Sequence, residues 1–409
     1  MKDNTFNKIK EKISSLKEIE GGYYKELFKD ISMKEFNSLE DFEKLPFTDK
    51  DDLRNCYPLG IQACPDEDVI RIHSSSGTTG LPVIIPYTKK DVDDWTLMFK
   101  RCYEMAGVGN LDRVHITPGY GLWTAGISFQ AGAEAVGAMA IPMGPGNTDK
   151  QLQMMKDLKS TVLCSTSSYA LLLAEKIEEL GIGDEIFLKR GLIGSEQWGK
   201  KMRRRIEETL GAKLYDIYGL TEIYGPGVAI SCDGEDGMHY WDDYFYFEIV
   251  NPETGEVLPE GEYGELVITT LEKEGAPLIR YRTHDLTRII PGKCSCGSEF
   301  PRIDTLKGRT DDMFKVKGVN MYPKQVEEVL AEIEGVSSEY QIMIDHLHGK
   351  DILTLYFEMD NGQSVEHIER EVFSQFKKKI GISIYPKAVG MYELPRSEKK
   401  TTRIFDNRY

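Results

Sequence analysis

The sequence has 409 residues, of which 40% are hydrophobic and 29% carry a charged side chain. This composition is typical of a globular protein with enough chain for two domains, and it excludes a wholly disordered polypeptide. Asp and Glu outnumber Lys and Arg by 67 to 51, which gives a formal net charge of −16. Because nucleic-acid binders need a basic face to contact phosphates, we expect no nucleic-acid partner.

The N-terminal segment predicts an amphipathic surface helix. Phe6, Ile9, Ile13 and Leu16 recur at helical spacing, without the apolar core of a signal peptide. No run reaches the roughly 18 apolar residues of a membrane helix. The 7 cysteines are an odd number, which argues against a disulfide framework. We therefore expect a cytoplasmic protein without a membrane segment.

From about residue 46 to residue 251, short apolar runs alternate with amphipathic helical stretches. This alternation predicts a largely parallel α/β sheet. The expected buried strands are 69–72, 114–116, 138–141 and 161–164, and the expected helices include 148–158 and 169–180.

The pattern changes twice after this region. Turn signals at 251–255 and 259–262 indicate a β-rich subdomain over 244–290. Beyond residue 308 the sequence predicts a compact α+β domain. Its expected elements are a helix opened by Pro323 and closed by Gly335, strands at 340–344 and 352–357, and a helix at 365–380.

A run of hydroxyl residues and glycines stands between the expected strands 69–72 and 83–85. It consists of Ser74, Ser75, Ser76, Gly77, Thr78, Thr79 and Gly80. Such a run offers many hydrogen-bond donors with little steric bulk, which suits a polyphosphate. It is not a Walker A loop, because no Gly-Lys-Ser/Thr follows and the next element has the pattern of a strand. Alone, the run fits a flexible linker as well as a phosphate site.

A second motif follows the expected strand 213–217. It consists of Asp216, Ile217, Tyr218, Gly219, Leu220, Thr221 and Glu222. Tyr218 could stack on a base, Thr221 could contact phosphate and Glu222 could hold Mg²⁺. A strand end with a buried tyrosine and a solvated glutamate is the alternative. Three further runs, 281–286, 308–318 and 394–403, could each be a charged turn or tail when taken singly.

Together and in this order, the motifs resemble those of the adenylate-forming superfamily, and most closely its phenylacetate–coenzyme A ligase branch. The resemblance runs from about residue 45 to residue 403. Its shared motifs are Ile72–Gly80, Asp216–Glu222 followed by Gly225–Pro226–Gly227, Arg309–Met313 and Leu394–Glu398. It implies an α/β fold with a large N-terminal domain, residues 1–308, including the β-rich subdomain. A small mobile α+β C-terminal domain, residues 309–409, would follow.

The resemblance also implies a reaction in two halves. A carboxylate attacks the α-phosphate of ATP to give an acyl-adenylate and pyrophosphate, and coenzyme A then takes the acyl group. An anion must approach a polyanion, so Mg²⁺ and a lysine would stabilise the transition state. ATP, Mg²⁺, a carboxylic acid and coenzyme A are thus the implied ligands, and relatives suggest a homodimer.

The resemblance also implies a role for each residue that aligns with a family motif. Ser74 to Gly80 would wrap the β- and γ-phosphates, and Thr221 and Glu222 would serve phosphate and Mg²⁺. The adenine and ribose site would comprise Gly194, Ser195, Glu196, Asp216, Ile217, Tyr218, Gly219, Asp285 and Arg309. Lys400 matches the mobile catalytic lysine, and Asp311 matches the hinge between the domains.

Three positions depart from the family pattern. His284 stands where the ribose-binding motif usually has glycine. Lys399 replaces the glycine that usually precedes the catalytic lysine, which makes Lys399 a second candidate for that role. Thr402 replaces a basic residue that could contact coenzyme A.

The segment matched to the aryl-acid pocket consists of Tyr120, Gly121, Leu122, Trp123, Thr124, Ala125 and Gly126. An aromatic residue flanked by small residues can form a flat apolar slot for a ring. Relatives often carry Phe where Trp123 stands, so the sequence does not name the acid. Trp123 could instead be a core residue.

Cys232, His239, Cys294 and Cys296 offer three thiolates and an imidazole, the ligand set of a four-coordinate Zn²⁺. Close relatives show a similar set, which favours a structural zinc site over a reduced cysteine pair in a surface loop. All four positions would be filled by protein, so the ion would stabilise the β-rich subdomain.

Three functions remain open from the sequence. The first is an aryl-acid–coenzyme A ligase. The second is an adenylating enzyme that passes its group to a carrier protein, an amine or a flavin-like coenzyme, as in F390 synthetase. The third is a non-catalytic nucleotide-binding or zinc-bearing protein. Glu222, Asp285 and Lys400 argue against the third, because a binding protein needs neither metal nor lysine chemistry.

Overall fold

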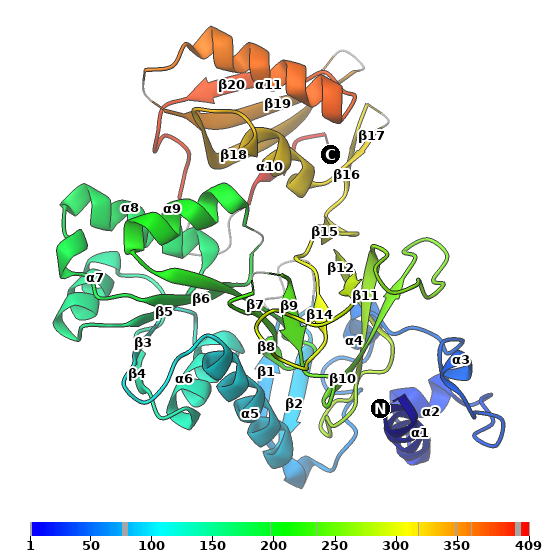
Figure 1. Ribbon diagram of the computed structural model, residues 1–409. Coiled ribbons are helices and arrows are strands. Elements are labelled where there is room, and N and C mark those ends of the chain that lie inside the picture. Colours follow the sequence, from blue (N-terminus) through cyan, green and yellow to red (C-terminus); the bar gives the residue numbers. More distant parts are fainter. Residues whose placement is uncertain are drawn as a thin grey trace. The chain divides into compact units, whose positions relative to one another are not determined.

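The computed structural model describes residues 2–75, 81–196, 198–234, 236–317, 319–347, 350–360, 362–396 and 402–408. The chain is a mixed α/β protein with a large N-terminal domain and a smaller C-terminal domain (Figure 1). Its contacts form two compact units. Unit 1 comprises Met1–Gly144, Val162–Cys164 and Tyr215–Thr305, and unit 2 comprises Pro145–Thr161, Ser165–Leu214 and Leu306–Tyr409. The domain boundary expected between residues 308 and 309 stays a prediction.

Unit 1 begins with the predicted amphipathic helix, α1 (Lys2–Glu18). Its residues Ile9 and Ile13 are fully buried in an apolar cluster with Phe28 and Phe42. The helices that follow in this unit are α2 (Tyr23–Leu27), α3 (Leu39–Phe42), α4 (Lys50–Asn55), α5 (Lys89–Met105) and α6 (Ala125–Ala135). Among the described residues, no helix is long and apolar enough to cross a membrane.

The sheet strands of unit 1 are partly parallel and partly antiparallel. β3 (Arg113–Ile116) lies between β4 (Met139–Pro142) and β5 (Val162–Thr166), and both neighbours run parallel to it. β7 (Lys213–Leu220), β8 (Gly225–Ser231) and β9 (Met238–Tyr240) are antiparallel. The expected largely parallel sheet is therefore confirmed for one part and wrong for the other. A short turn joins β7 to β8, and strands joined by a short turn must be antiparallel.

Two strands expected to be buried are partly exposed. They are β4, in which Met139 is 54% exposed, and β1. β1 (Val69–Ser74) forms a two-stranded antiparallel hairpin with β2 (Ile84–Thr88). Ile70 is 53% exposed and Ile72 is 41% exposed. The apolar run predicted burial wrongly because only one face of this hairpin packs against protein, whereas a strand inside a parallel sheet is covered on both faces.

The predicted β-rich subdomain is confirmed. β10 (Phe245–Val250), β11 (Gly264–Thr270) and β12 (Tyr281–Thr287) pair in this order as antiparallel strands. The short strands β13 (Ile289–Ile290) and β14 (Arg302–Ile303) follow, and β14 pairs with β9.

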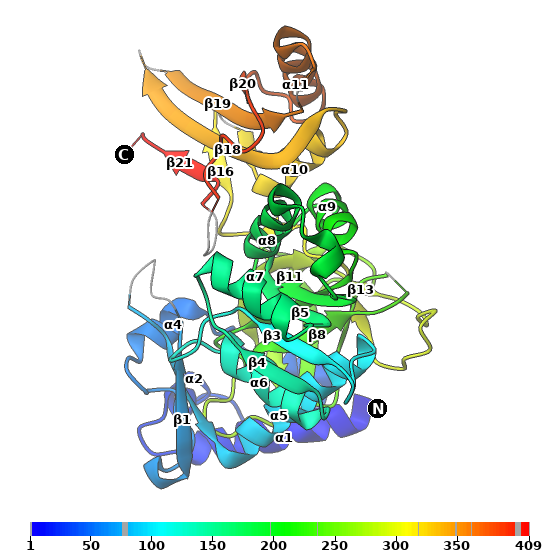
Figure 2. The same cartoon turned by 90° about the vertical axis from the view of Figure 1, so that its left-hand side faces the viewer.

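In unit 2, helices α10 and α11 lie on one face of a sheet with the strand order β20-β19-β18-β21 (Figure 2). The expected C-terminal elements are present, although α10 ends at Ala331 and not at Gly335. The elements of this unit are α7 (Thr148–Asp157), α8 (Ser167–Leu180), β6 (Arg190–Gly194), α9 (Lys200–Leu210), β15 (Gly308–Arg309), β16 (Phe314–Val316), β17 (Val319–Met321), α10 (Pro323–Ala331), β18 (Val336–Leu347), β19 (Lys350–Met359), α11 (Val365–Lys379), β20 (Tyr385–Val389) and β21 (Ile404–Asp406).

Candidate functional site

Thr221 and Glu222 lie in the tight turn between β7 and β8, which we call the hairpin tip (residues 221–224). The pairing register shifts between Tyr218 and Gly219 as the chain enters this turn. A Cβ at Gly219 would lie 1.9 Å from the backbone oxygen of Gly225. Glycine is therefore required here, because no side chain fits between the strands.

Gly219→Ala should distort the hairpin tip and lower the free energy of unfolding by more than about 2 kcal/mol. The added methyl group must displace backbone, which cannot yield as a side chain can. Gly109→Ala is the matched control, because a Cβ at Gly109 meets nothing within 4 Å. Thermal unfolding of the two variants tests this prediction. Equal midpoints would show that the hairpin accommodates the methyl group.

Glu222 carries a buried carboxylate that faces a cation. Its residue is 3% exposed, and Oε1 lies 3.0 Å from Nζ of Lys50, the first residue of α4. Lys50 itself keeps 37% of its side chain exposed. Lys50 is not among the residues expected from the sequence, because nothing in the local pattern of a capped helix start links it to a turn far along the chain. The alternative of a solvated Glu222 is wrong.

Tyr218 and Asp285 are brought together as expected for one site. The Tyr218 hydroxyl donates a hydrogen bond of 2.6 Å to Oδ2 of Asp285, and both residues are buried. Asp285 lies on β12 of the β-rich subdomain. The remaining members of the 216–219 motif belong to β7, where Ile217 is a core residue.

His284 replaces the usual glycine at a position where the backbone favours glycine. Its φ is +65°, in the left-handed region that costs a side chain roughly 1–2 kcal/mol. Its backbone N–H donates to Oε1 of Glu265 at 3.2 Å, and its Nδ1 lies 3.4 Å from the same oxygen. The buried Glu265 carboxylate thus anchors His284 in this conformation.

The start of the Ser/Thr/Gly run, Ser74 and Ser75, is held by hydrogen bonds. Ser74 N–H donates to the Leu122 carbonyl at 2.8 Å, and Ser75 N–H donates to the Val83 carbonyl at 3.0 Å. Val83 N–H in turn donates to Oγ of Ser75 at 2.9 Å. Ser76, Gly77, Thr78, Thr79 and Gly80 lie outside the described residues, so their phosphate role stays a prediction.

The segment expected to bind the acyl group leads into α6 and contacts the strand after the hairpin tip. Trp123 is 51% exposed, so the alternative of a core residue is wrong. A Cβ at Gly225 would lie 2.5 Å from Cβ of Thr124, so the two backbones approach closely. The Tyr120 hydroxyl is buried and lacks a hydrogen-bond partner within the described ranges. Unit 1 therefore brings together the acyl segment, the start of the Ser/Thr/Gly run and the hairpin tip.

Other expected site residues belong to unit 2. Glu196 Oε2 accepts hydrogen bonds from Ser167 Oγ at 3.1 Å and from Ser168 N–H at 3.0 Å, at the start of α8. Arg309 and Asp311 form a bidentate salt bridge, in which both N–O distances are 2.8 Å. The residue expected at the ribose thus contacts the residue expected at the hinge. Lys399 and Lys400 lie outside the described residues.

Cys232, His239, Cys294 and Cys296 form one cluster in unit 1, in which the four ligand atoms lie within 4.8 Å of one another. Cys232 Sγ lies 3.5 Å from Cys294 Sγ, and Cys296 Sγ lies 3.3 Å from Nε2 of His239. Nδ1 of His239 contacts the Phe300 carbonyl at 2.7 Å, so Nδ1 carries the proton and Nε2 is directed toward the thiols. This donor set and spacing fit a tetrahedral ion.

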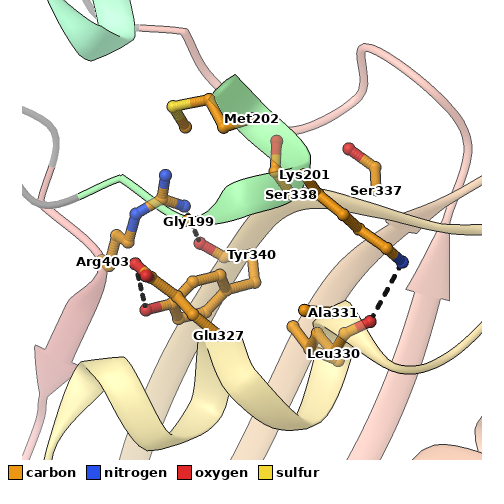
Figure 3. Close-up of a pocket in the computed structure, with 10 residues that line it drawn as sticks. All are labelled: Gly199, Lys201, Met202, Glu327, Leu330, Ala331, Ser337, Ser338, Tyr340 and Arg403. Atoms are coloured by element: carbon orange, nitrogen blue, oxygen red, sulfur yellow. Dashed lines mark hydrogen bonds between the residues drawn. The ribbon is translucent and has the colours of Figure 1, made fainter. Parts of the chain in front are cut away.

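A small cavity in unit 2 contains none of the predicted site residues (Figure 3). Its volume is about 20 Å³, enough for one water molecule. Glu327 and Arg403 line it, and burial raises the pKa of Glu327. Lys201, at the start of α9, donates to the carbonyls of Leu330 at 3.2 Å and Ile333 at 2.7 Å. These contacts hold α9 against the end of α10.

Comparison with known proteins identifies the family. Residues 17–271 match the family model described as AMP-binding enzyme, and residues 318–408 match the AMP-binding enzyme C-terminal domain. The chain belongs to the family of AMP-binding enzymes. Within that family, the phenylacetate-coenzyme A ligase of Pseudomonas putida is 43% identical over 379 residues, covering 90% of this chain and 85% of the relative. The phenylacetate-coenzyme A ligase of Escherichia coli (strain K12) is 42% identical over 383 residues, covering 91% of this chain and 87% of the relative.

A solved structure extends the likeness of this AMP-binding enzyme to the fold of the full chain. The 2-hydroxyisobutyryl-CoA ligase, in its postadenylation state, matches with a TM-score of 0.90 at 26% identity and covers 100% of this chain and 90% of that one. The two matched family ranges contain the Ser/Thr/Gly run, the hairpin tip and Lys400. Asp285, Arg309 and Asp311 lie between these ranges. The individual roles of all the site residues stay predictions.

Proposed function

We propose that this AMP-binding enzyme activates an aryl or arylacetic acid with ATP and transfers the acyl group to coenzyme A. The products are acyl-coenzyme A, AMP and pyrophosphate. The observation that carries the proposal is the close approach, in unit 1, of the acyl segment to the hairpin tip, where Thr124 lies against Gly225. The tip carries the buried Glu222 carboxylate paired with Lys50. Identity of about 40% to phenylacetate-coenzyme A ligases supports the acid class.

The reaction requires two anions, the substrate carboxylate and ATP, to come together in the active site. Glu222 would hold Mg²⁺, whose charge would neutralise the phosphates as the carboxylate attacks. Lys50 balances the charge of Glu222 in the structure. Because the Lys50 side chain is 37% exposed, it can move aside when the Glu222 carboxylate binds Mg²⁺. Lys400 would bridge the acid and the α-phosphate. Tyr218 and Asp285 would hold the nucleoside, the first by stacking and the second by accepting ribose hydroxyls.

A thioester assay tests the proposed function. The enzyme with phenylacetate, ATP, Mg²⁺ and coenzyme A should form phenylacetyl-coenzyme A and AMP in equal amounts. Omitting coenzyme A should leave acid-dependent pyrophosphate exchange intact. Adenylate formation without a thioester would favour another acceptor, such as a carrier protein or an amine. No acid-dependent exchange with any aryl or arylacetic acid would contradict the proposal.

We also propose that Cys232, His239, Cys294 and Cys296 bind a structural Zn²⁺. Three thiolates and one imidazole fill all four positions of a tetrahedral ion and leave none for a substrate. A Cβ at Gly234 would lie 2.9 Å from Cys294 Sγ, so the turn is shaped around the sulfur atoms. The ion would join the turn after β8 to the loop between β13 and β14.

Metal analysis of the purified protein should find about one zinc per chain. Cys232→Ser should lose most of that zinc and lower the thermal midpoint, because a structural ion contributes folding free energy. Cys56→Ser is the matched control, since this thiol lies outside the cluster. A wild-type protein without zinc, or a Cys232→Ser variant that retains it fully, would refute the site.

Three other expectations stay predictions. They are the use of Mg²⁺, the homodimer and the cytoplasmic location. Metal dependence of pyrophosphate exchange tests the first, and light scattering of the purified enzyme tests the second.

A further inference from the structure

A fully buried lysine has no role in the chemistry described so far. Lys273 lies in the loop between β11 and β12 and is 0% exposed. Its Nζ finds no hydrogen-bond partner in the described part of the chain. The ammonium lies 3.8 Å from the centre of the Tyr87 ring and 4.0 Å from that of Tyr224. A buried charge without hydrogen bonds is costly, and contact with two ring faces offsets part of that cost.

The two rings that hold Lys273 support the C-terminal end of the hairpin tip. Tyr224 is the last residue of the tip, directly after Glu222 and Ile223. Tyr87 stacks on Trp95, with ring centres 5.5 Å apart and planes inclined by 26°. Nε1 of Trp95 donates to the Pro226 carbonyl at 3.0 Å, just beyond the tip. A shift of either ring would therefore move the backbone that carries Glu222.

Tyr87, Trp95 and Tyr224 form an aromatic layer, and this layer also supports the acyl segment. His73 packs edge-on against Tyr87 and Trp95, with ring centres 5.2 Å and 5.4 Å away. Nδ1 of His73 contacts the Leu122 carbonyl at 3.1 Å, and this carbonyl also accepts from Ser74 N–H. The layer therefore underlies the start of the Ser/Thr/Gly run, the acyl segment and the hairpin tip.

We propose that Lys273 is a positioning residue of the adenylation site, whose ammonium holds the Tyr87 and Tyr224 rings and through them the hairpin tip and the acyl segment. The role depends on charge, because a cation attracts both ring faces and a neutral amine does not. The backbone of the lysine is fixed independently. Asp91 accepts hydrogen bonds from Glu274 N–H and Gly275 N–H, both at 2.8 Å. This inference rests on the proposed function.

The charge of Lys273 is poised to change near neutral pH. Burial lowers the pKa of Lys273 to about 7, and the charge of Asp91 on α5 opposes the shift. Burial lowers the pKa of His73 to about 4, so this imidazole is neutral above about pH 6. Burial raises the pKa of Tyr87 and of Tyr224 well above the ordinary value, so both phenols are neutral as well. Other charged groups near these rings are Glu222 in the hairpin tip and Asp94 on α5. Further ones are Arg71 on β1, Lys12 on α1, and Glu272 and Glu274 in the same loop.

Lys273→Met removes the charge and keeps the length of the side chain, so it tests the proposal directly. The quantity to measure is the ratio of wild-type to variant kcat/KM in acid-dependent pyrophosphate exchange, from about pH 6 to pH 9. Below the pKa the wild type carries an ammonium that the variant lacks, so the ratio should reach about tenfold or more. Above the pKa both side chains are neutral and the ratio should approach one. A ratio that stays constant with pH would overturn the proposal.

Lys90→Met is the matched control, because Lys90 pairs with Asp94 and Glu272 at the surface beside the same loop. Its ratio should stay near one at every pH. If Lys273→Met does not fold, Tyr87 supplies the second test. Tyr87→Leu removes a ring that stabilises the cation, so the inflection of the wild-type profile should move to lower pH, whereas Tyr87→Phe should leave it in place. An unmoved inflection in Tyr87→Leu would overturn the proposal.

A wild type without exchange would contradict the proposed function and not this inference. The affinity for ATP, measured by calorimetry over the same pH range, would then replace kcat/KM in the ratio. If the ratio of wild-type to Lys273→Met affinity for ATP falls as the pH rises through about 7, the role of Lys273 is supported. A ratio that stays constant with pH would overturn it.

Discussion

Lys400→Ala should abolish acid-dependent pyrophosphate exchange and leave ATP binding largely intact. The matched role of this lysine is to bridge two anions as they approach, so its charge matters more in the transition state than in the bound state. Loss of one such group reduces rates by about 10²–10³ or more. Exchange kinetics and calorimetric ATP binding of the same preparation measure the two effects. Unchanged exchange in the variant would remove Lys400 from the mechanism.

Lys399→Ala is the natural control for Lys400→Ala. The two lysines are adjacent, carry the same charge and stand where the family has Gly-Lys. If Lys400 is the residue that aligns with the catalytic lysine of the family, Lys399→Ala should retain a rate of exchange within a fewfold of wild type. A large loss in Lys399→Ala with a small loss in Lys400→Ala would move the catalytic role by one residue.

The sequence predicted those parts of the fold and site that depend on local pattern. The amphipathic spacing of Ile9 and Ile13 predicted a helix with one buried face, and both residues are fully buried. Pro323 predicted the start of α10 because its fixed φ suits a first helical turn. The Cys/His set was recognised from ligand chemistry, and the fold brings its two distant halves together.

The rest depends on contacts between segments that lie far apart in sequence. The Lys50–Glu222 pair and the contact of Lys273 with Tyr87 cross long stretches of chain, and a pattern read within a short window cannot detect them. The exposure of Ile70 on β1 has the same origin, because it depends on which elements cover the hairpin. His284 differs again, since its left-handed backbone is a property of the strand geometry beside Glu265.

Arg396→Met should destabilise unit 2 by about 3–5 kcal/mol. The Arg396 guanidinium is 12% exposed and pairs with two carboxylates that are more buried still, Glu175 on α8 and Glu358 on β19. The distances are 3.0 Å to each Glu175 oxygen and 2.8 Å to each Glu358 oxygen. Burial disfavours the charged guanidinium, but the two carboxylates outweigh it and raise the pKa of Arg396 above its ordinary value. Removing the arginine takes the bidentate cation away from the Glu358 carboxylate and leaves Glu175 with the longer, 3.5 Å contact to Nη2 of Arg205.

Thermal unfolding of Arg396→Met measures this cost. The control is Lys379→Met, which breaks a pair with Glu332 whose side chains are 33% and 61% exposed and should cost less than about 1 kcal/mol. An Arg396→Met midpoint equal to that of the control would show that water or Arg205 compensates the carboxylates.

Glu175→Gln is a milder change in the cluster of Arg396, Glu175 and Glu358. It tests whether the cluster only stabilises the protein or also positions Lys400. Glu175→Gln should weaken the contact with α8 and leave the Arg396–Glu358 pair in place, so the protein should lose less stability than Arg396→Met. Arg396 stands shortly before Lys400 in the sequence, and α8 is one of the two elements that fix it. If that contact helps to present the lysine, Glu175→Gln should lower the rate of pyrophosphate exchange at a temperature where the variant is fully folded. Exchange equal to wild type under those conditions would limit the cluster to a structural role, because a carboxylate that positions Lys400 cannot lose its charge without moving the residues that follow Arg396.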